Sequence, residues 1–147
     1  MNKNTILRYL LVASLFFASG LLASQVLTNK QDPYILEHEK DIAAQQPGPH
    51  DGGGNTTAFN FFAKAPDFQL AFRKRILHPG SAIGYHLQKE DEIYYVLSGR
   101  GEMQMNGRSF DVKAGDAVLT RPGSSHGLKQ TGSEDLVIII NYIKKEN

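Results

Sequence analysis

The sequence predicts one small all-β barrel domain over residues 57–147, and three observations support this fold class. After Thr57 the chain alternates apolar and polar residues in short runs, which is the period-2 pattern of a strand with one buried face. Turn signals such as Pro79-Gly80 and Pro122-Gly123 separate these runs. No long helical period appears among them. Many short strands at regular spacing indicate a sandwich or a barrel.

The expected strands follow one another with a turn signal between each pair. Asn106-Gly107 is a strong signal for a two-residue hairpin, because both residues tolerate a positive φ. The strands are expected at Phe68 to Ile76, Ala82 to Gln88, Glu92 to Leu97, Glu102 to Met105, Ser109 to Val112, Ala117 to Thr120, His126 to Lys129 and Leu136 to Tyr142.

Residues 1–24 have the order of a secretory signal peptide. Lys3 and Arg8 accompany an apolar run from Tyr9 to Ala23, and small residues close that run. The run is short for a bilayer-spanning helix, which needs about 20 residues. Extending it to Leu27 keeps an uncleaved membrane anchor open as the alternative. In either case we expect the rest of the chain to be exported, to the periplasm or outside the cell.

Residues 25–56 are expected to form a helical segment and a linker between the signal and the barrel. Gln31 to Ala44 has a modest helical signal, with Pro33 in a position that suits a first turn. Gln45 to Asn55 has no apolar residue to bury and predicts a flexible linker or a long loop. His50, within that stretch, is expected to be a solvated loop histidine.

Composition excludes several classes of site. The formal net charge of the chain is +1, and it becomes −1 without Lys3 and Arg8. A near-neutral domain gives no electrostatic reason to expect nucleic acid or an anionic membrane surface as a partner. The chain has no cysteine, which excludes disulfides, thiolate zinc sites and cysteine nucleophiles.

Four polar side chains are expected to converge inside the barrel. His86 and Gln88 are two residues apart, so they share one face of a strand. Glu92 opens the following strand, and His126 arrives from a separate strand after Pro122-Gly123. Two imidazoles and one carboxylate form the facial arrangement that leaves open positions on a metal. The sequence therefore predicts a divalent metal site with His86, Gln88, Glu92 and His126 as ligands.

The same residues resemble a known family. Gly84 to Gly99 resembles the first motif of the cupins, in which a His-x-His pair precedes a glutamate and a glycine, here Glu92 and Gly99. Gly115 to His126 resembles the second motif, a glycine followed by Pro-x-Gly-x-x-His. The resemblance covers Phe68 to Tyr142. It implies a jelly-roll barrel with His86, Glu92 and His126 as metal ligands. Three positions depart from the motifs: Gln88 replaces a histidine, Arg121 a proline and Gln130 an asparagine.

The expected function is that of an exported cupin with one divalent metal that acts on a small carboxylate, enolate or sugar acid. The neutral amide oxygen of Gln88 favours Fe²⁺, Mn²⁺ or Ni²⁺, with Zn²⁺ as a further possibility. The reaction would be that of a dioxygenase, an isomerase or a lyase. The alternatives are a non-catalytic protein that binds a small ligand and a metal-free structural cupin.

Two pairs of residues are candidates for the pocket wall. Tyr94 and Tyr95 alternate faces, and we expect Tyr94 to line the cavity and Tyr95 to pack on the outer face. Met103 and Met105 share a face and would form either a flexible pocket wall or part of the core.

Two further patterns concern surfaces. Arg73 and Arg75 share one face of their expected strand, and their side chains could bind an anion. The interpretation that we favour is a solvated edge strand. A homodimer is expected, because Ile138 and Ile140 are placed on an outer face that needs cover.

Overall fold

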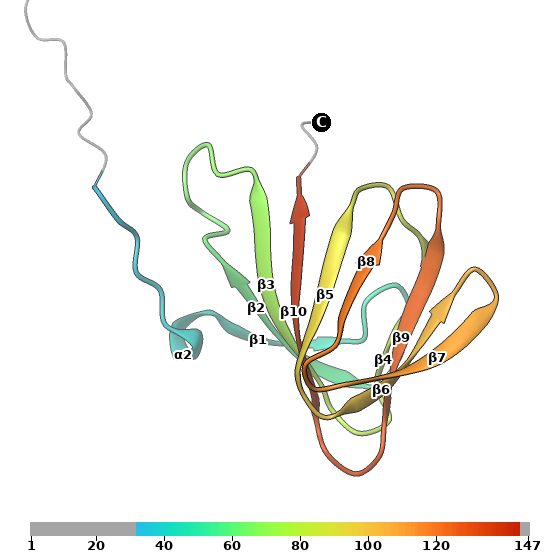
Figure 1. Ribbon diagram of the computed structural model, residues 1–147. Coiled ribbons are helices and arrows are strands. Elements are labelled where there is room, and N and C mark those ends of the chain that lie inside the picture. The colour runs from blue at the N-terminus through green and yellow to red at the C-terminus, as the bar shows by residue number, and fades with distance from the viewer. Residues whose placement is uncertain (1–31, 145–147) are drawn as a thin grey trace, which may run out of the picture. The chain divides into compact units, whose positions relative to one another are not determined.

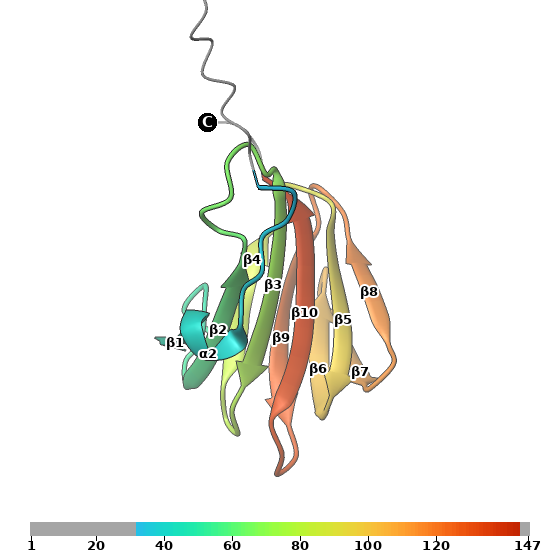
Figure 2. The ribbon, with the colours of Figure 1, turned by 90° about the vertical axis from the view of Figure 1, so that its left-hand side faces the viewer.

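Two antiparallel sheets lie face to face in the computed structural model, which describes residues 32–144 (Figures 1 and 2). This arrangement confirms the all-β jelly-roll prediction. Residues 35–144 belong to one compact unit. Its elements are α2 (Glu39–Ile42), β1 (Ala43–Pro47), β2 (Asn55–Phe61), β3 (Leu70–Leu77), β4 (Ala82–Leu87), β5 (Glu92–Ser98), β6 (Arg100–Met105), β7 (Arg108–Lys113), β8 (Ala117–Thr120), β9 (Ser125–Thr131) and β10 (Leu136–Ile143).

The strand order shows how distant parts of the chain meet. The six-stranded sheet has the order β1-β2-β3-β10-β5-β8, and the four-stranded sheet has the order β4-β9-β6-β7. The last strand, β10, therefore lies between β3 and β5 in the middle of its sheet. The tight hairpin expected at Asn106-Gly107 joins β6 to β7, and both residues have a positive φ, of 47° and 77°.

The period-2 pattern determines which side chains enter the barrel. Along β5 the side chains of Glu92, Tyr94 and Val96 are buried, whereas Ile93 and Tyr95 are exposed. Tyr94 thus faces the interior and Tyr95 the outer face, as the alternation predicts.

The orientation expected for Ile138 and Ile140 is wrong. Both lie on the inner face of β10, where Ile138 is 0% and Ile140 6% exposed. Because β10 pairs with β3 on one side and β5 on the other, its alternate residues from Leu136 onward pack into the core. The exposed apolar residues of this sheet lie on β5, β8 and the end of β10: Ile93, Tyr95, Leu97, Leu119 and Ile143.

The segment before Asn55 also differs from expectation. In its described part, the helix expected over Gln31 to Ala44 is limited to the four residues of α2. The supposed linker begins inside strand β1, which pairs with β2 from Ala43 opposite Phe59 to Pro47 opposite Asn55. Backbone pairing with β2 satisfies the amides of this polar stretch, so it needs no apolar residues of its own to be ordered.

The proposed signal peptide, residues 1–24, lies outside the described residues. Over residues 32–144 there is no helix with the length and apolar character needed to cross a membrane.

Candidate metal centre

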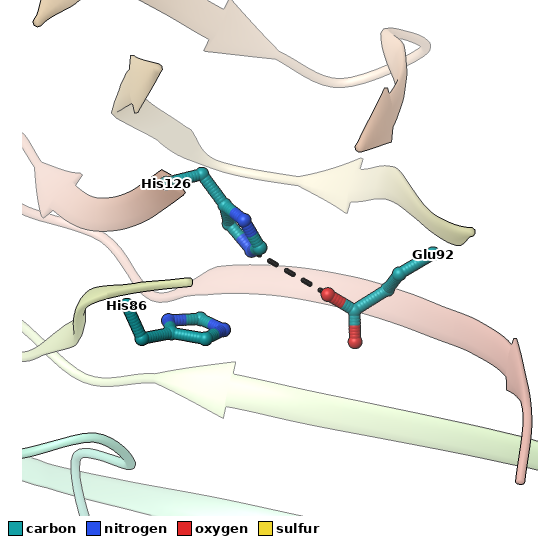
Figure 3. Close-up of side chains that lie close together, drawn as sticks. All are labelled: His86, Glu92 and His126. Atoms are coloured by element: carbon teal, nitrogen blue, oxygen red, sulfur yellow. Dashed lines mark ion pairs between the residues drawn. The ribbon is translucent and has the colours of Figure 1, made fainter. Parts of the chain in front are cut away.

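Three of the four predicted ligands meet at one point inside the barrel. One ligand atom from each of His86, Glu92 and His126 lies within 4.8 Å of the other two. Figure 3 shows the two imidazoles and the carboxylate converging from separate strands. His86 comes from β4, Glu92 opens β5 and His126 comes from β9. This group could therefore hold a metal ion.

Strand pairing explains why the two histidines are neighbours. His86 lies directly opposite His126 in the β4–β9 ladder, just after a register shift between Ile83 and His86. Their ring centroids are 4.4 Å apart. The register shift matters because moving a strand by one residue reverses the face of each side chain.

The backbone fixes the orientation of the His86 ring. Its Nδ1 donates a hydrogen bond of 2.8 Å to the carbonyl oxygen of Gly84. In this tautomer Nε2 carries a lone pair and is the nitrogen that would bind a cation. Such a bond from the second ring nitrogen is the usual way in which a metal-binding histidine is held in place.

His126 and Glu92 are more deeply buried and are linked by Tyr94. Nε2 of His126 lies 3.4 Å from Oε2 of Glu92 and forms a hydrogen bond of 3.0 Å with the hydroxyl group of Tyr94. Burial, and secondarily the Glu92 carboxylate, raise the pKa of Tyr94 well above its ordinary value. The phenol therefore stays protonated at neutral pH and supports His126 as a neutral hydroxyl group.

Two atoms of this group show that a cation suits the site. Within residues 32–144, Oε2 of Glu92 and Nδ1 of His126 are buried and form no hydrogen bond, and Oε2 has its polar contact of 3.4 Å with Nε2 of His126. Leaving a buried carboxylate oxygen without a partner is costly, and a bound cation would remove that cost. Two imidazoles with one carboxylate are also a donor set that first-row divalent metals accept. The residues present therefore fit a divalent metal.

Gln88, the fourth predicted ligand, lies just beyond β4. It is buried, and its backbone forms hydrogen bonds with Ser124 and Gly123. Its side-chain Nε2 donates to the carbonyl oxygen of Glu90 at 2.9 Å. Oε1 is then the atom that Gln88 can offer to a metal or to a ligand.

A polar pocket of about 260 Å³ opens next to the three ligands. Its wall consists of His50, Arg73, His86, Leu87, Gln88, Lys89, Glu90, Glu92 and Tyr142. The candidates Tyr94, Met103 and Met105 are not among these residues. Tyr94 and Met103 belong to the hydrophobic core, and Met105 lies opposite His126 in the β6–β9 ladder.

His50 is an exposed loop residue, as its sequence context predicts, but its side chain also contributes to this pocket wall. The loop of residues 48–54 runs along the edge of β4, where Pro49 and Gly53 accept hydrogen bonds from the amides of Gly84 and Ala82. A Cβ on Gly84 would collide with the carbonyl oxygen of His50. A Cβ on Gly48 or Gly52 of the loop would likewise collide with the carbonyl oxygen of Ala82, so these two glycines indicate close backbone contact.

The expectation that Arg73 and Arg75 lie on a solvated edge strand is also wrong. Their strand, β3, is paired on both sides, with β2 and with β10. Arg75 is only 7% exposed, and Arg73 lines the pocket. The shared face of the two arginines was visible in the sequence, but the direction of that face depended on the pairing.

Comparisons with known proteins agree with this architecture. Residues 74–142 match the family model described as the cupin domain. Among solved structures, a predicted oxalate decarboxylase from Thermotoga maritima superposes with a TM-score of 0.69 at 30% identity, over 76% of this chain and 100% of that one. A polyketide cyclase from Streptomyces resistomycificus, at 18% identity and a TM-score of 0.63 over 76% of this chain and 80% of that one, shares the fold.

Two curated proteins align with shorter parts of the chain. The oxalate-binding protein of Thermotoga maritima is 44% identical over 66 residues, which are 44% of this chain and 54% of that protein. A 5-nitrosalicylic acid 1,2-dioxygenase from Bradyrhizobium is 24% identical over 66 residues, 45% of this chain and 32% of the enzyme. The chain thus spans about half the length of the first of these relatives and a third of the second.

Proposed function

Because the chain belongs to the cupin superfamily, and because His86, Glu92 and His126 converge beside a small polar pocket, we propose that it binds a small carboxylate through one divalent metal ion. The convergence of the three donors is the observation that carries this proposal. Oxalate is the first ligand to test, since a 44% identical relative is named for binding it.

The protein supplies donors, orientation and a restricted space for this function. His86, Glu92 and His126 would hold the ion, and Gln88 would add a neutral oxygen. The metal would act as a Lewis acid to which carboxylate oxygens bind. A volume of about 260 Å³ is just below the usual range of small-molecule pockets, which favours a ligand of a few heavy atoms.

Charge supports a carboxylate as the ligand. Glu92 is the only anionic member of the proposed ligand set, so the site with a divalent ion has a net positive charge. Arg73 and Lys89 add two cationic groups to the pocket wall and Glu90 adds one anionic group, so the net charge stays positive. An anion is attracted to such a site, whereas a cationic ligand is repelled.

Metal content and ligand titration test the proposal. The protein, purified without a histidine tag, is analysed for bound metals and then titrated with oxalate by calorimetry after loading with Mn²⁺. We expect one metal ion per chain and oxalate binding that requires it. The matched variants are His126→Ala, which should lose the metal, and His38→Ala, which changes an exposed histidine on the N-terminal side of α2 and should retain it. A folded parent protein that binds no divalent metal contradicts the proposal and favours a structural cupin.

A second candidate function is chemistry on the bound carboxylate. Three or four protein donors leave open positions on a six-coordinate ion, which permits a second ligand such as dioxygen beside the carboxylate. The similarity to a dioxygenase also favours this candidate. Aerobic incubation of the iron-loaded protein with oxalate and a panel of small acids, followed by product analysis, separates the two functions. Binding without any product over hours identifies a binding protein.

A further inference from the structure

Two arginines enter the barrel from β3, the strand paired with β2 and β10. Alternate residues of this strand, namely Ala71, Arg75 and Leu77, are buried, and Arg73 belongs to the same face. A β-strand alternates its side chains between two faces, so both guanidinium groups originate on the barrel side of the sheet. Cationic side chains on an inner face are unfavourable unless something compensates them.

Arg75 has polar partners but no counter-charge. It donates hydrogen bonds to Oγ1 of Thr56 at 2.8 Å and Oε1 of Gln46 at 3.4 Å. Within residues 32–144 its guanidinium forms no ion pair with a carboxylate. Burial, and then the neighbouring charge of Arg73, lower the pKa of Arg75. The two positive charges thus affect each other inside the barrel.

Arg73 lies on the pocket wall beside the metal centre. Its guanidinium carbon is 5.1 Å from the centre of the Tyr142 ring. Tyr142 is directly opposite Glu92 in the β10–β5 ladder, and both residues line the pocket. Because β10 lies between β3 and β5, Tyr142 stands between Arg73 and Glu92 on the wall of the same pocket. In the described part of the chain, Arg73 also has no carboxylate at ion-pair distance.

The charges of the pocket wall favour a ligand with two negative charges. Arg73 and Lys89 balance Glu90 and Glu92, so a bound divalent ion leaves two positive charges in the pocket. A dianion neutralises these charges, whereas a monoanion leaves one of them. Arg75, two residues along the same face, adds a further positive charge.

We propose that Arg73 is the second anchor of this pocket and that the ligand is a small dicarboxylate, with oxygen atoms on the metal and a far carboxylate oxygen on the guanidinium of Arg73. This assignment rests on the proposed function, because it needs the metal as the first anchor. A planar guanidinium forms two parallel hydrogen bonds with a carboxylate, and the Tyr142 ring holds that plane in place.

The test compares dicarboxylates with a monocarboxylate on the manganese-loaded protein. Oxalate, malonate and formate are titrated by calorimetry into the parent, Arg73→Gln, Arg73→Lys and Arg108→Gln proteins. Arg108→Gln is the charge-matched control, because Arg108 is exposed on β7. Manganese content and the melting temperature of each variant are measured alongside.

We expect Arg73→Gln to weaken oxalate and malonate binding by about tenfold or more, the loss typical of a hydrogen bond to a charged group. Formate, which is too short to reach both anchors, should lose less than about threefold. The dicarboxylate affinities of Arg73→Lys should lie between those of the parent and Arg73→Gln proteins, since lysine keeps the charge but lacks the planar guanidinium group. Arg108→Gln should leave all three affinities unchanged.

The outcomes separate this proposal from the one before it. A parent protein that binds manganese but no carboxylate contradicts the proposed function itself. A parent protein that binds all three acids, with a preference for oxalate over formate that Arg73→Gln does not change, contradicts only the assignment of Arg73. Equal losses for oxalate and formate together with a lower melting temperature would show that Arg73 is structural, and would overturn the assignment.

Discussion

The imidazole of His50 stacks on that of His86, with ring centroids 3.6 Å apart and ring planes 7° from parallel. His86 thus has one ring face covered by a residue of the 48–54 loop, while its Nδ1 donates a hydrogen bond to the carbonyl oxygen of Gly84. His50 has a positive φ of 53°, and Asp51 after it has a φ of 57°. The loop therefore adopts an uncommon backbone conformation that brings His50 to the metal centre.

Loss of this stacking contact should weaken metal binding. An aromatic pair contributes about 0.5–1.5 kcal/mol beyond its buried area, so we expect His50→Ala to lower manganese affinity by about two- to tenfold. His50→Phe is the matched variant, because it keeps an aromatic ring, and because phenylalanine and alanine must both adopt the positive φ of this position. Titration of the metal-free proteins with Mn²⁺ checks this, and equal affinities for parent and His50→Ala proteins would show that the contact does not position His86.

Gln88 is expected to set the metal preference. An amide oxygen is a weaker donor than an imidazole, so Gln88→His should raise the affinity for Zn²⁺ and Cu²⁺ more than that for Mn²⁺. Gln88→Ala should weaken all metals and leave the fold intact. Changes outside the ligand shell cost about 10–100-fold, and loss of a ligand should reach at least that range. Metal titration of Gln88→Ala decides the matter: an affinity within about twofold of the parent removes Gln88 from the ligand set.

Gly84→Ala should destabilise the barrel and displace the 48–54 loop. The added Cβ would collide with the carbonyl oxygen of His50, and overpacking of this kind costs about 1–3 kcal/mol. Urea denaturation measures the change in the free energy of unfolding. Ala117→Ser, which adds one atom at an exposed position of β8, is the control and should change little. An unchanged midpoint for Gly84→Ala would mean that the loop moves away at no cost.

The chain is expected to form a homodimer through the outer face of β5 and β8. Ile93 and Leu119 lie opposite each other in the β5–β8 ladder, and Tyr95 and Leu97 extend the exposed apolar face. A contiguous apolar patch of this kind is typical of a protein interface. Leu119→Asp should convert the dimer to a monomer in light scattering, whereas Phe110→Asp, on the exposed side of β7, should not. A monomer mass for the parent protein at micromolar concentration contradicts this prediction.

Export should be visible in the mass of the mature protein. The basic start and short apolar run predict cleavage between about Gly20 and Gln25. Mass spectrometry of the protein from its native host locates the cut. An intact N-terminus in a membrane fraction would instead support the anchor.

The alternation of apolar and polar residues was sufficient to predict the all-β class and most strands from β3 onward. That pattern is local, since each strand presents every second residue to the core. The motif spacing also placed His86, Glu92 and His126 together, as the structure does.

Long-range pairing decided what local pattern could not. The polar stretch from Gln45 onward forms the end of strand β1 and the loop that carries His50, because β2 and the edge of β4 supply its hydrogen-bond partners. Long-range pairing also decided the direction of four side chains, those of Arg73, Arg75, Ile138 and Ile140. Their face was predictable, but whether that face points into the barrel depends on β3 and β10 lying side by side. These two strands are far apart in the sequence, so only the folded chain determines the direction of their side chains.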